Sequence, residues 1–339
     1  MLRIRRGAAL LVGAAFGLGV ACSAAGAADM AALPRKAPPP SPFVLDVHGF
    51  VDVTFKNTSV TPRGLMVREY SGLTTQVANG LVLDVYKDPG GFINGVSFYG
   101  GTWNDVWSKN NDPVVGSWAE FDWWVGMSVK FAKYWKFGVE YVEFLSPTTV
   151  ATSFPATERN FEFSLAYDDS HWGYPIVINP YVKLFYAASG PSTVVLGKRG
   201  NTYDVEIGMV PTFDSKKYSG IPLIFSAPTW ITVGPKSYWN RNDGTTNFCG
   251  VLSNAPCAQS NAGVFSTGLQ AKYMVEAIPK RLGSWYVKGG FQYYHIINEA
   301  LLGAQVLTGA AGGASGVAGT FPNAHKDIVI GYGGFGFTF

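Results

Sequence analysis

The 339-residue sequence is poor in charge, because Asp, Glu, Lys and Arg together make up 14% of it, against roughly one quarter in soluble domains. After the first 28 residues it also lacks an apolar run long enough for a membrane helix, which needs about 20 residues. Its net charge of +3 is small, so no nucleic-acid partner is expected. These shortages disfavour both an ordinary soluble domain and a helical membrane protein.

Aromatic residues, at 15%, and glycine, with 41 copies, are abundant instead. The apolar residues are spread in alternation with polar ones rather than gathered in runs. In lipid, only helices and closed barrels satisfy every backbone hydrogen-bonding group internally. A membrane protein without spanning helices is therefore expected to be a β-barrel.

The first 28 residues have the features of a secretory signal peptide. Arg3, Arg5 and Arg6 precede an apolar run over residues 7–20, and small residues follow it. We expect cleavage after Ala27 or Ala28.

Three segments are expected in the chain. Residues 1–28 are the signal peptide, and residues 29–43 are rich in proline, which favours an extended periplasmic tether. Residues 44–339 are the barrel.

From Val44 onward, segments of about ten to fifteen residues alternate with a period of two, separated by turn-forming residues. In the clearest one, Phe121, Trp123 and Val125 face one side, and Glu120 and Asp122 the other. A period of two places one row in lipid and the other in the lumen. The sequence predicts an all-β fold, a transmembrane antiparallel up-and-down β-barrel of twelve strands, with ten or fourteen as alternatives.

The connections between these segments alternate in length. Short turns are expected at residues 88–91, 132–134 and 278–283. Longer polar stretches fall near residues 57–73, 105–116, 147–157, 189–200, 235–262 and 298–324. Bacterial barrels have short periplasmic turns and long external loops. The predicted location is the bacterial outer membrane, with outer-membrane lipid as the surroundings.

The last strand carries Phe335, Phe337 and Phe339 on one face. Terminal aromatic alternation of this kind resembles the signal read by the barrel-assembly machinery, which is the protein partner we expect. An ordinary edge strand with aromatic packing is the alternative.

Two aromatic clusters beside short turns fit the belts that barrels place at membrane interfaces. One is Tyr134, Trp135 and Phe137, and the other is Trp285 with Tyr286.

Cys249 and Cys257 lie in one polar segment of a chain predicted to be exported, so a loop disulfide is expected. Metal binding is the alternative, but no nearby Cys or His completes a ligand set. The run Asn240, Asn242, Asp243 and Gly244 is interpreted as a turn rather than a calcium loop. No metal and no cofactor are expected.

Outer-membrane phospholipases are the relevant enzymatic comparison, and they need a Ser activated by a His two residues away on the same strand. The histidines His48, His171, His295 and His325 are not followed by Ser at that spacing. We therefore expect no enzymatic activity.

The phase of each segment assigns a set of charged residues to the lumen. The selectivity candidates are Asp46, Asp52, Asp84, Glu120, Asp122, Lys130, Lys136, Glu140, Glu162, Lys183, Asp204 and Glu206. The excess of acids predicts a mild preference for cations or neutral solutes. The alternative is that many acids pair with lysines across strands. Large residues are expected to narrow the lumen, namely Trp118, Trp124, Phe144 and Phe185.

Three motifs resemble the TorF-type porin family over residues 44–210. They are Arg63-Gly64 after the first strand, GVSFYGGTWN at residues 95–104, and EFDWWVG at residues 120–126. The resemblance implies a barrel and passive transport, and it supplies neither a substrate nor catalytic residues.

The function expected from the sequence is a porin-like channel for passive diffusion of small solutes. A closed structural or adhesive barrel, whose external loops bind a ligand or surface, is the competing hypothesis. Uptake of hydrophobic compounds is a third. The sequence leaves the oligomeric state open.

Overall fold

A computed structural model describes residues 42–64, 66–68, 72–108, 117–145, 147, 157–189, 201–239, 258–302 and 325–339. The chain from Ser41 to Phe339 forms one compact unit. The expected signal peptide, the cysteine pair and the turn at residues 240–244 lie outside the described residues, as does all but the end of the tether.

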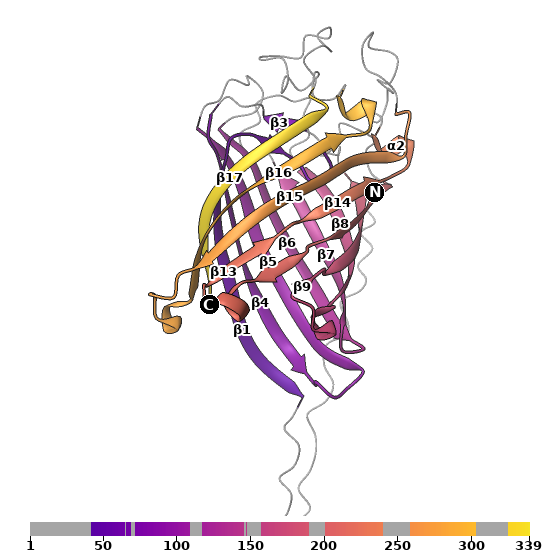
Figure 1. Cartoon of the computed structure of the whole chain (residues 1–339). Helices are drawn as coiled ribbons and strands as arrows, with labels where there is room; N and C mark the ends of the chain where they lie inside the picture. The colour runs from indigo at the N-terminus through magenta and orange to yellow at the C-terminus, as the bar shows by residue number, and fades with distance from the viewer. Residues whose placement is uncertain are drawn as a thin grey trace, which may run out of the picture. The chain divides into compact units, whose positions relative to one another are not determined.

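Twelve strands form the wall of a closed barrel (Figure 1). They are β1 (Phe43–Lys56), β4 (Thr74–Lys87), β5 (Ile93–Trp107), β6 (Trp118–Phe131), β7 (Trp135–Leu145), β8 (Thr157–Tyr167), β10 (Pro180–Ser189), β11 (Thr202–Met209), β14 (Thr229–Val233), β15 (Ala262–Met274), β16 (Ser284–Ile296) and β17 (Asp327–Thr338). Each pairs antiparallel with its neighbours, and the β14–β15 and β1–β17 pairings complete the ring. The predicted twelve-stranded, all-β barrel is confirmed.

Shorter elements accompany the wall. β2 (Ser59–Val60) and β3 (Met66–Arg68) pair with each other, and β9 (Ile176–Val177), β12 (Thr212–Asp214) and β13 (Leu223–Ser226) extend the main sheet. The helical turns are η1 (Ser170–Trp172), α1 (Lys216–Ser219), α2 (Lys236–Trp239) and η2 (Lys280–Leu282). Among the described residues, no helix is long and apolar enough to span a membrane.

β9 with β10, β11 with β12, and β13 with β14 are three membrane strands, each interrupted by two residues. The pairs Pro180↔Met209 and Thr212↔Val177 keep one register across the first interruption, as do Met209↔Thr229 and Thr212↔Ser226 across the second. Proline lies at each break, namely Pro180, Pro211 and Pro228. Because proline has no N–H, it cannot continue the ladder of hydrogen bonds.

Neighbouring groups satisfy the backbone at these breaks. The Asp169 carboxylate accepts hydrogen bonds from the N–H groups of Ile178 and Asn179, both at 2.8 Å. The Asn179 side chain donates to the Val210 carbonyl at 3.1 Å. The N–H of Ala227 donates to the Pro211 carbonyl at 2.8 Å, so the wall stays closed through the interruptions.

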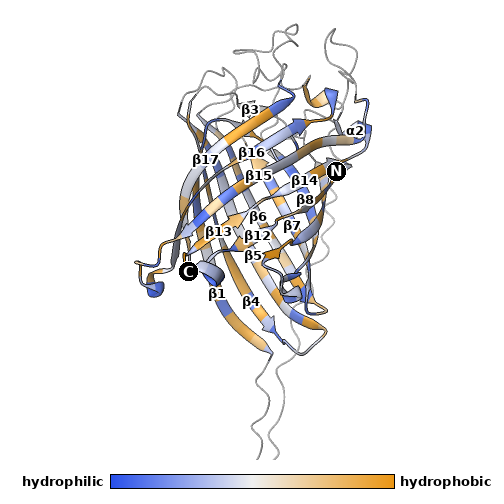
Figure 2. Cartoon of the chain, in the orientation of Figure 1, coloured by the Kyte–Doolittle hydropathy of each residue, from blue (hydrophilic) through white to orange (hydrophobic). Residues whose placement is uncertain are grey.

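The two faces of each strand differ as the period of two predicts. In β8, Phe161, Phe163 and Leu165 are exposed on the outer face, while Glu162 and Ser164 lie inward and are partly buried. Figure 2 shows apolar residues distributed over the strands of the wall. An apolar exterior on a closed barrel is the arrangement of outer-membrane proteins, so the chain is an outer-membrane β-barrel.

Two inferred side-chain directions are wrong. Trp118, expected in the lumen, points outward, because a bulge at Ala119 pairs Trp118 with Val106 while Glu120 stays opposite Asp105. The Trp118 ring packs on Phe121 of the outer face.

Tyr286, expected in an interface belt, is buried on the lumen side, where its hydroxyl donates to Asp52 at 2.6 Å. Trp285 does face outward and stacks on Phe337, with ring centroids 4.5 Å apart. The correction follows from alternation, since adjacent residues in a strand cannot share a face.

Long and short connections lie at opposite ends of the barrel. The long ones span residues 57–73, 108–117, 146–156, 190–201, 234–261 and 297–326, and the short ones residues 88–92, 132–134, 168–175, 215–222 and 275–283. The predicted alternation is confirmed, and the sequence had identified three of the five short turns. The end with long connections is called the external end below.

The join between the first and last strands is short. β1 pairs with β17 from Phe50↔Thr338 to Lys56↔Tyr332, which is seven residue pairs. β16 and β17 share twelve, from Ser284↔Thr338 to His295↔Asp327. Gly49 also exchanges two backbone hydrogen bonds with Phe339, so only the part of β1 before Gly49 pairs with β4 alone.

Candidate functional site in the lumen

The connection after β1 turns into the barrel, and residues 57–64 of it are called the inward loop. Thr58, Ser59 and Val60 are buried, although they belong to a connection between membrane strands. The Ser59 hydroxyl donates to the Asp105 carboxylate of β5 at 3.1 Å. An external loop therefore occupies part of the lumen.

Arg63 anchors the inward loop to the opposite wall. Its guanidinium lies 3.4 Å from Glu162 of β8 and 3.4 Å from Asp204 of β11. The same group sits 3.7 Å from the centre of the Phe185 ring of β10, in cation–π geometry. One side chain thus joins three wall strands.

Arg63 stays protonated and positively charged in this setting. Burial opposes it, but the carboxylates of Asp204 and Glu162 act more strongly and raise the pKa of Arg63 above its usual value. An arginine with two carboxylates and an aromatic face has matched partners for its planar, delocalised charge.

Gly64 and Pro62 hold the inward loop against β14, β15 and β16. Gly64 has a φ of +91°, and a Cβ there would lie 3.0 Å from both Ile296 and Val264. The Trp230 indole N–H donates to the Pro62 carbonyl at 3.0 Å. The Arg-Gly pair behind the family resemblance therefore anchors the inward loop. A larger residue at position 64 would be strained by the positive φ and crowded by Ile296 and Val264.

A hydrophobic cluster surrounds this anchor at the external end. It includes Val60, Phe185, Ile296, Ile328 and Ile330, together with Tyr238 and Trp239 of α2, which are fully buried. The Trp239 indole N–H is held by the Asn261 carbonyl at 2.9 Å, and its ring lies over Gly263. Burial raises the pKa of the Tyr238 hydroxyl well above its usual value.

Acidic residues gather on one side of the lumen near the external end. Asp105 of β5 lies opposite Glu120 of β6, and Asp122, Phe144 and Glu158 follow one another across β6, β7 and β8. Asp105, Asp122 and Glu158 are buried. These four carboxyl-bearing residues, Asp105, Glu120, Asp122 and Glu158, are called the acidic wall.

Lysines lie on the other side. Lys288 of β16 contacts Asp52 of β1 at 2.6 Å, and Tyr286 donates to the same carboxylate. Lys272 of β15 sits 4.3 Å from the centre of the Tyr286 ring. The alternative that acids pair with lysines therefore holds for Asp52.

Elsewhere the predicted lumen residues meet in both like and opposite pairs. Lys183 is opposite Glu206, but Lys130 is opposite Lys136, and Glu140 is opposite Glu162. Charge neutralisation across neighbouring strands is thus incomplete among these candidates, because like charges meet in two of the three pairs.

Asp46 and Asp84 lie away from the inward loop, near the periplasmic end. Both contact Lys87, at 2.8 and 2.9 Å. With His48 they form the one group of possible metal ligands among the described residues. Lys87 contacts both carboxylates and offsets one of their two negative charges, which weakens their ability to hold a cation.

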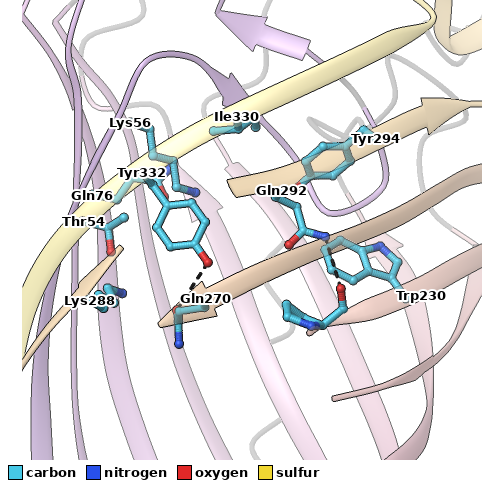
Figure 3. Close-up of a pocket in the computed structure, with 11 residues that line it drawn as sticks. Thr54, Lys56, Gln76, Trp230, Gln270, Lys288, Gln292, Tyr294, Ile330 and Tyr332 are labelled. Carbon is cyan, nitrogen blue, oxygen red and sulfur yellow. Dashed lines mark hydrogen bonds between the residues drawn. The ribbon is translucent and has the colours of Figure 1, made fainter. Parts of the chain in front are cut away.

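A cavity of about 240 Å³ lies in the lumen between β1, β4, β14, β15, β16 and β17. Figure 3 shows polar side chains from all of these strands around it. Its lining is Thr54, Lys56, Gln76, Pro228, Trp230, Gln270, Lys288, Gln292, Tyr294, Ile330 and Tyr332. The inward loop contacts it through Trp230, which bonds Pro62.

The sequence did not identify Lys56, Asp105, Glu158 or Arg63 as lumen residues of interest. The strand phase offered a signal for Lys56, which shares the face of Asp52 and Thr54. The position of Arg63 had no such signal, because the direction of a connection does not follow from periodicity.

No protein-family model matches the chain, and no curated protein matches it. Solved structures match the chain. A COG4313 outer membrane channel from Pseudomonas putida F1 is 10% identical with a TM-score of 0.44, covering 90% of this chain and 100% of that one.

The OccD1 (OprD) structure is 9% identical with a TM-score of 0.32, covering 88% and 97%. A FadL homologue of Pseudomonas aeruginosa is 9% identical with a TM-score of 0.28, covering 86% and 88%. Because the sequence identities and TM-scores are this low, the fold is assigned from the strand pairing of this chain. The likeness to TorF-type porins stays a resemblance.

Proposed function

We propose that this protein is a passive channel for small hydrophilic solutes across the outer membrane, narrowed by its inward loop. The observation that carries the proposal is the polar, charged lumen of a closed barrel. Charged groups such as Glu140, Lys183 and Glu206 along its interior are groups that water and a polar solute can contact. Selection by such a pore depends on diameter, charge and hydrogen bonding, so no catalytic group is required.

The acidic wall supports a mild preference for cations. Carboxylates on one side of a low-dielectric enclosure raise the local concentration of positive ions. The inward loop, with Arg63, Phe185 and Phe144, supports a narrow path rather than a wide one. The Phe144 and Phe185 rings stack with centroids 6.1 Å apart.

Single-channel recording in planar bilayers tests the channel. We expect small, stable, ohmic steps from purified barrel. Electrical silence from protein that still shows heat-modifiable migration, and is therefore folded, would overturn the channel and favour the closed barrel.

Reversal potentials under a salt gradient test the preference. Glu120→Gln combined with Asp122→Asn should lower the cation-to-anion permeability ratio by about twofold or more, because the neutral amides no longer attract cations. Glu143→Gln is the matched control, since Glu143 lies on the outer face with Arg159. A wild-type channel that prefers anions would contradict this part of the proposal.

A further inference from the structure

The cavity shown in Figure 3 has the composition of a ligand site. We propose that it binds a small hydroxylated monocarboxylate, of about the size of a monosaccharide acid, on its way through the barrel. The proposal rests on the proposed function, because it names one class of solute for the channel. The cavity is lined by Lys56 and Lys288 and by no residue of the acidic wall, so it can select an anion although the acidic wall favours small cations.

The charge of the cavity sets the charge of the ligand. Lys288 is neutralised by Asp52, whose carboxylate lies 2.6 Å from it. Lys56 also lines the cavity, and within the described part of the chain its ammonium group forms no ion pair. Asp105 and Asp52 attract Lys56 from a distance, but no carboxylate among the described residues contacts its ammonium group, so a carboxylate on the solute can pair with it directly.

The amides and hydroxyls of the lining set the rest of its polarity. Gln76, Gln270 and Gln292 line the cavity, and a primary amide can both donate and accept. The Gln292 amide already donates to Ser266 and to the Pro228 carbonyl, so its donors are engaged. The Tyr332 hydroxyl is 3.4 Å from Gln270, a long contact that a solute hydroxyl can replace. Groups with both hydrogen-bonding roles match hydroxyls, which also donate and accept.

Two aromatic rings give the cavity an apolar side. Trp230 and Tyr294 meet edge to face, with centroids 5.9 Å apart. Because the Trp230 N–H is held by Pro62, this ring is fixed in place. The volume of about 240 Å³ is below the roughly 300–1,000 Å³ of sites for drug-sized ligands, which suits a solute of a single ring.

Calorimetric titration of the detergent-solubilised full barrel tests the ligand class without requiring conduction. The probes are D-galacturonate, D-galactose and D-galactosamine, which share one ring and differ in charge. We expect galacturonate to bind at least roughly tenfold more tightly than the neutral sugar, and the cationic sugar not to bind. Equal binding of galacturonate and galactose would overturn the proposal, as would no binding of galacturonate.

Variants locate the site. Lys56→Gln should weaken galacturonate binding roughly 10- to 100-fold, the effect of losing one charged hydrogen bond. Lys56→Arg should retain most of it, and Lys217→Gln is the control, because Lys217 is exposed in α1, outside the cavity. Unchanged affinity in folded Lys56→Gln would refute the site.

The two proposals fail separately. A conducting barrel that binds no galacturonate loses this inference and keeps the channel. A barrel that binds galacturonate at the cavity but conducts no ions keeps the site and loses passive conduction.

Discussion

Arg63 is the residue on which the position of the inward loop depends. It contacts Glu162, Asp204 and the Phe185 ring at once, and its side chain is only 9% exposed. Removing one member of such a group leaves carboxylates without their cation in a poorly hydrated place, which costs more than the lost attraction.

Arg63→Ala should therefore destabilise the folded barrel by about 3 kcal/mol and free the inward loop. We expect larger and noisier single-channel steps, together with a lower midpoint of unfolding in denaturant titrations of the barrel in phospholipid vesicles.

Arg159→Ala is the control for this change, because Arg159 forms an exposed pair with Glu143 on the outer face. Such pairs contribute less than about 1 kcal/mol. If Arg63→Ala left both conductance and midpoint at wild-type values, Arg63 would not anchor the loop.

Sequence reasoning at this scale succeeded where alternation decides the outcome. Glu120 and Asp122 were placed in the lumen from phase alone, and the structure puts them beside Asp105 and Glu158. Trp118 failed because one bulged residue reverses the phase of everything beyond it. The residues at the bulge, Trp118 and Ala119, are of types found throughout the strands, so the sequence gives no signal of its position.

Strand elements were predictable, but their interruptions were not. The three broken strands read as continuous segments, since the register continues across Pro211 and Pro228. Whether a proline ends a strand or only interrupts it depends on the groups that satisfy the neighbouring backbone, such as the Asp169 carboxylate.

Asp169→Ala should loosen the turn at residues 168–175 and the start of the β9–β10 strand. Two N–H groups lose an ionised acceptor, and hydrogen bonds to charged groups contribute about 1.5–3 kcal/mol each. Limited proteolysis should cut this turn faster in the variant than in wild type.

Asp168→Asn is a closely matched comparison, because Asp168 is exposed and its hydrogen bonds go to Ser170 of the same turn. These bonds lower the pKa of Asp168, so the wild-type contact is lost only in acid. Equal cleavage of the Asp169 variant and wild type would show that the β9–β10 interruption does not need the cap.

At the scale of the whole molecule, the barrel separates two environments within one strand. In β8, Phe163 faces outward. Ser164 faces the lumen two residues from Glu162, which lies opposite Glu140. The closed ring and the apolar exterior followed from the sequence because every strand repeats the same alternation. The content of the lumen did not, because it depends on where a connection folds.

Phe163→Arg should lower the free energy of unfolding from lipid by about 2–4 kcal/mol, since it places a charge among acyl chains. Ser164→Arg, one residue away, should cost less, because the lumen is polar and the nearby Glu140 and Glu162 offset the repulsion from Lys183, which lies opposite Ser164. Denaturant titration in phospholipid vesicles measures both. Equal effects of the two substitutions would contradict the assignment of the faces.

The seven-pair join between β1 and β17 sets the order in which the ring can form. Its partners are about 280 residues apart, as in Phe50↔Thr338, whereas the other joins of the ring link wall strands that follow one another along the chain. Bringing such distant ends together has an entropic cost that is recovered only when the pairs form, and few pairs are available here. Neighbouring strands can therefore pair one after another into an open sheet. We expect closure of the ring to be the last and slowest step. Until that event the pairing edges of the first and last strands are open to another chain.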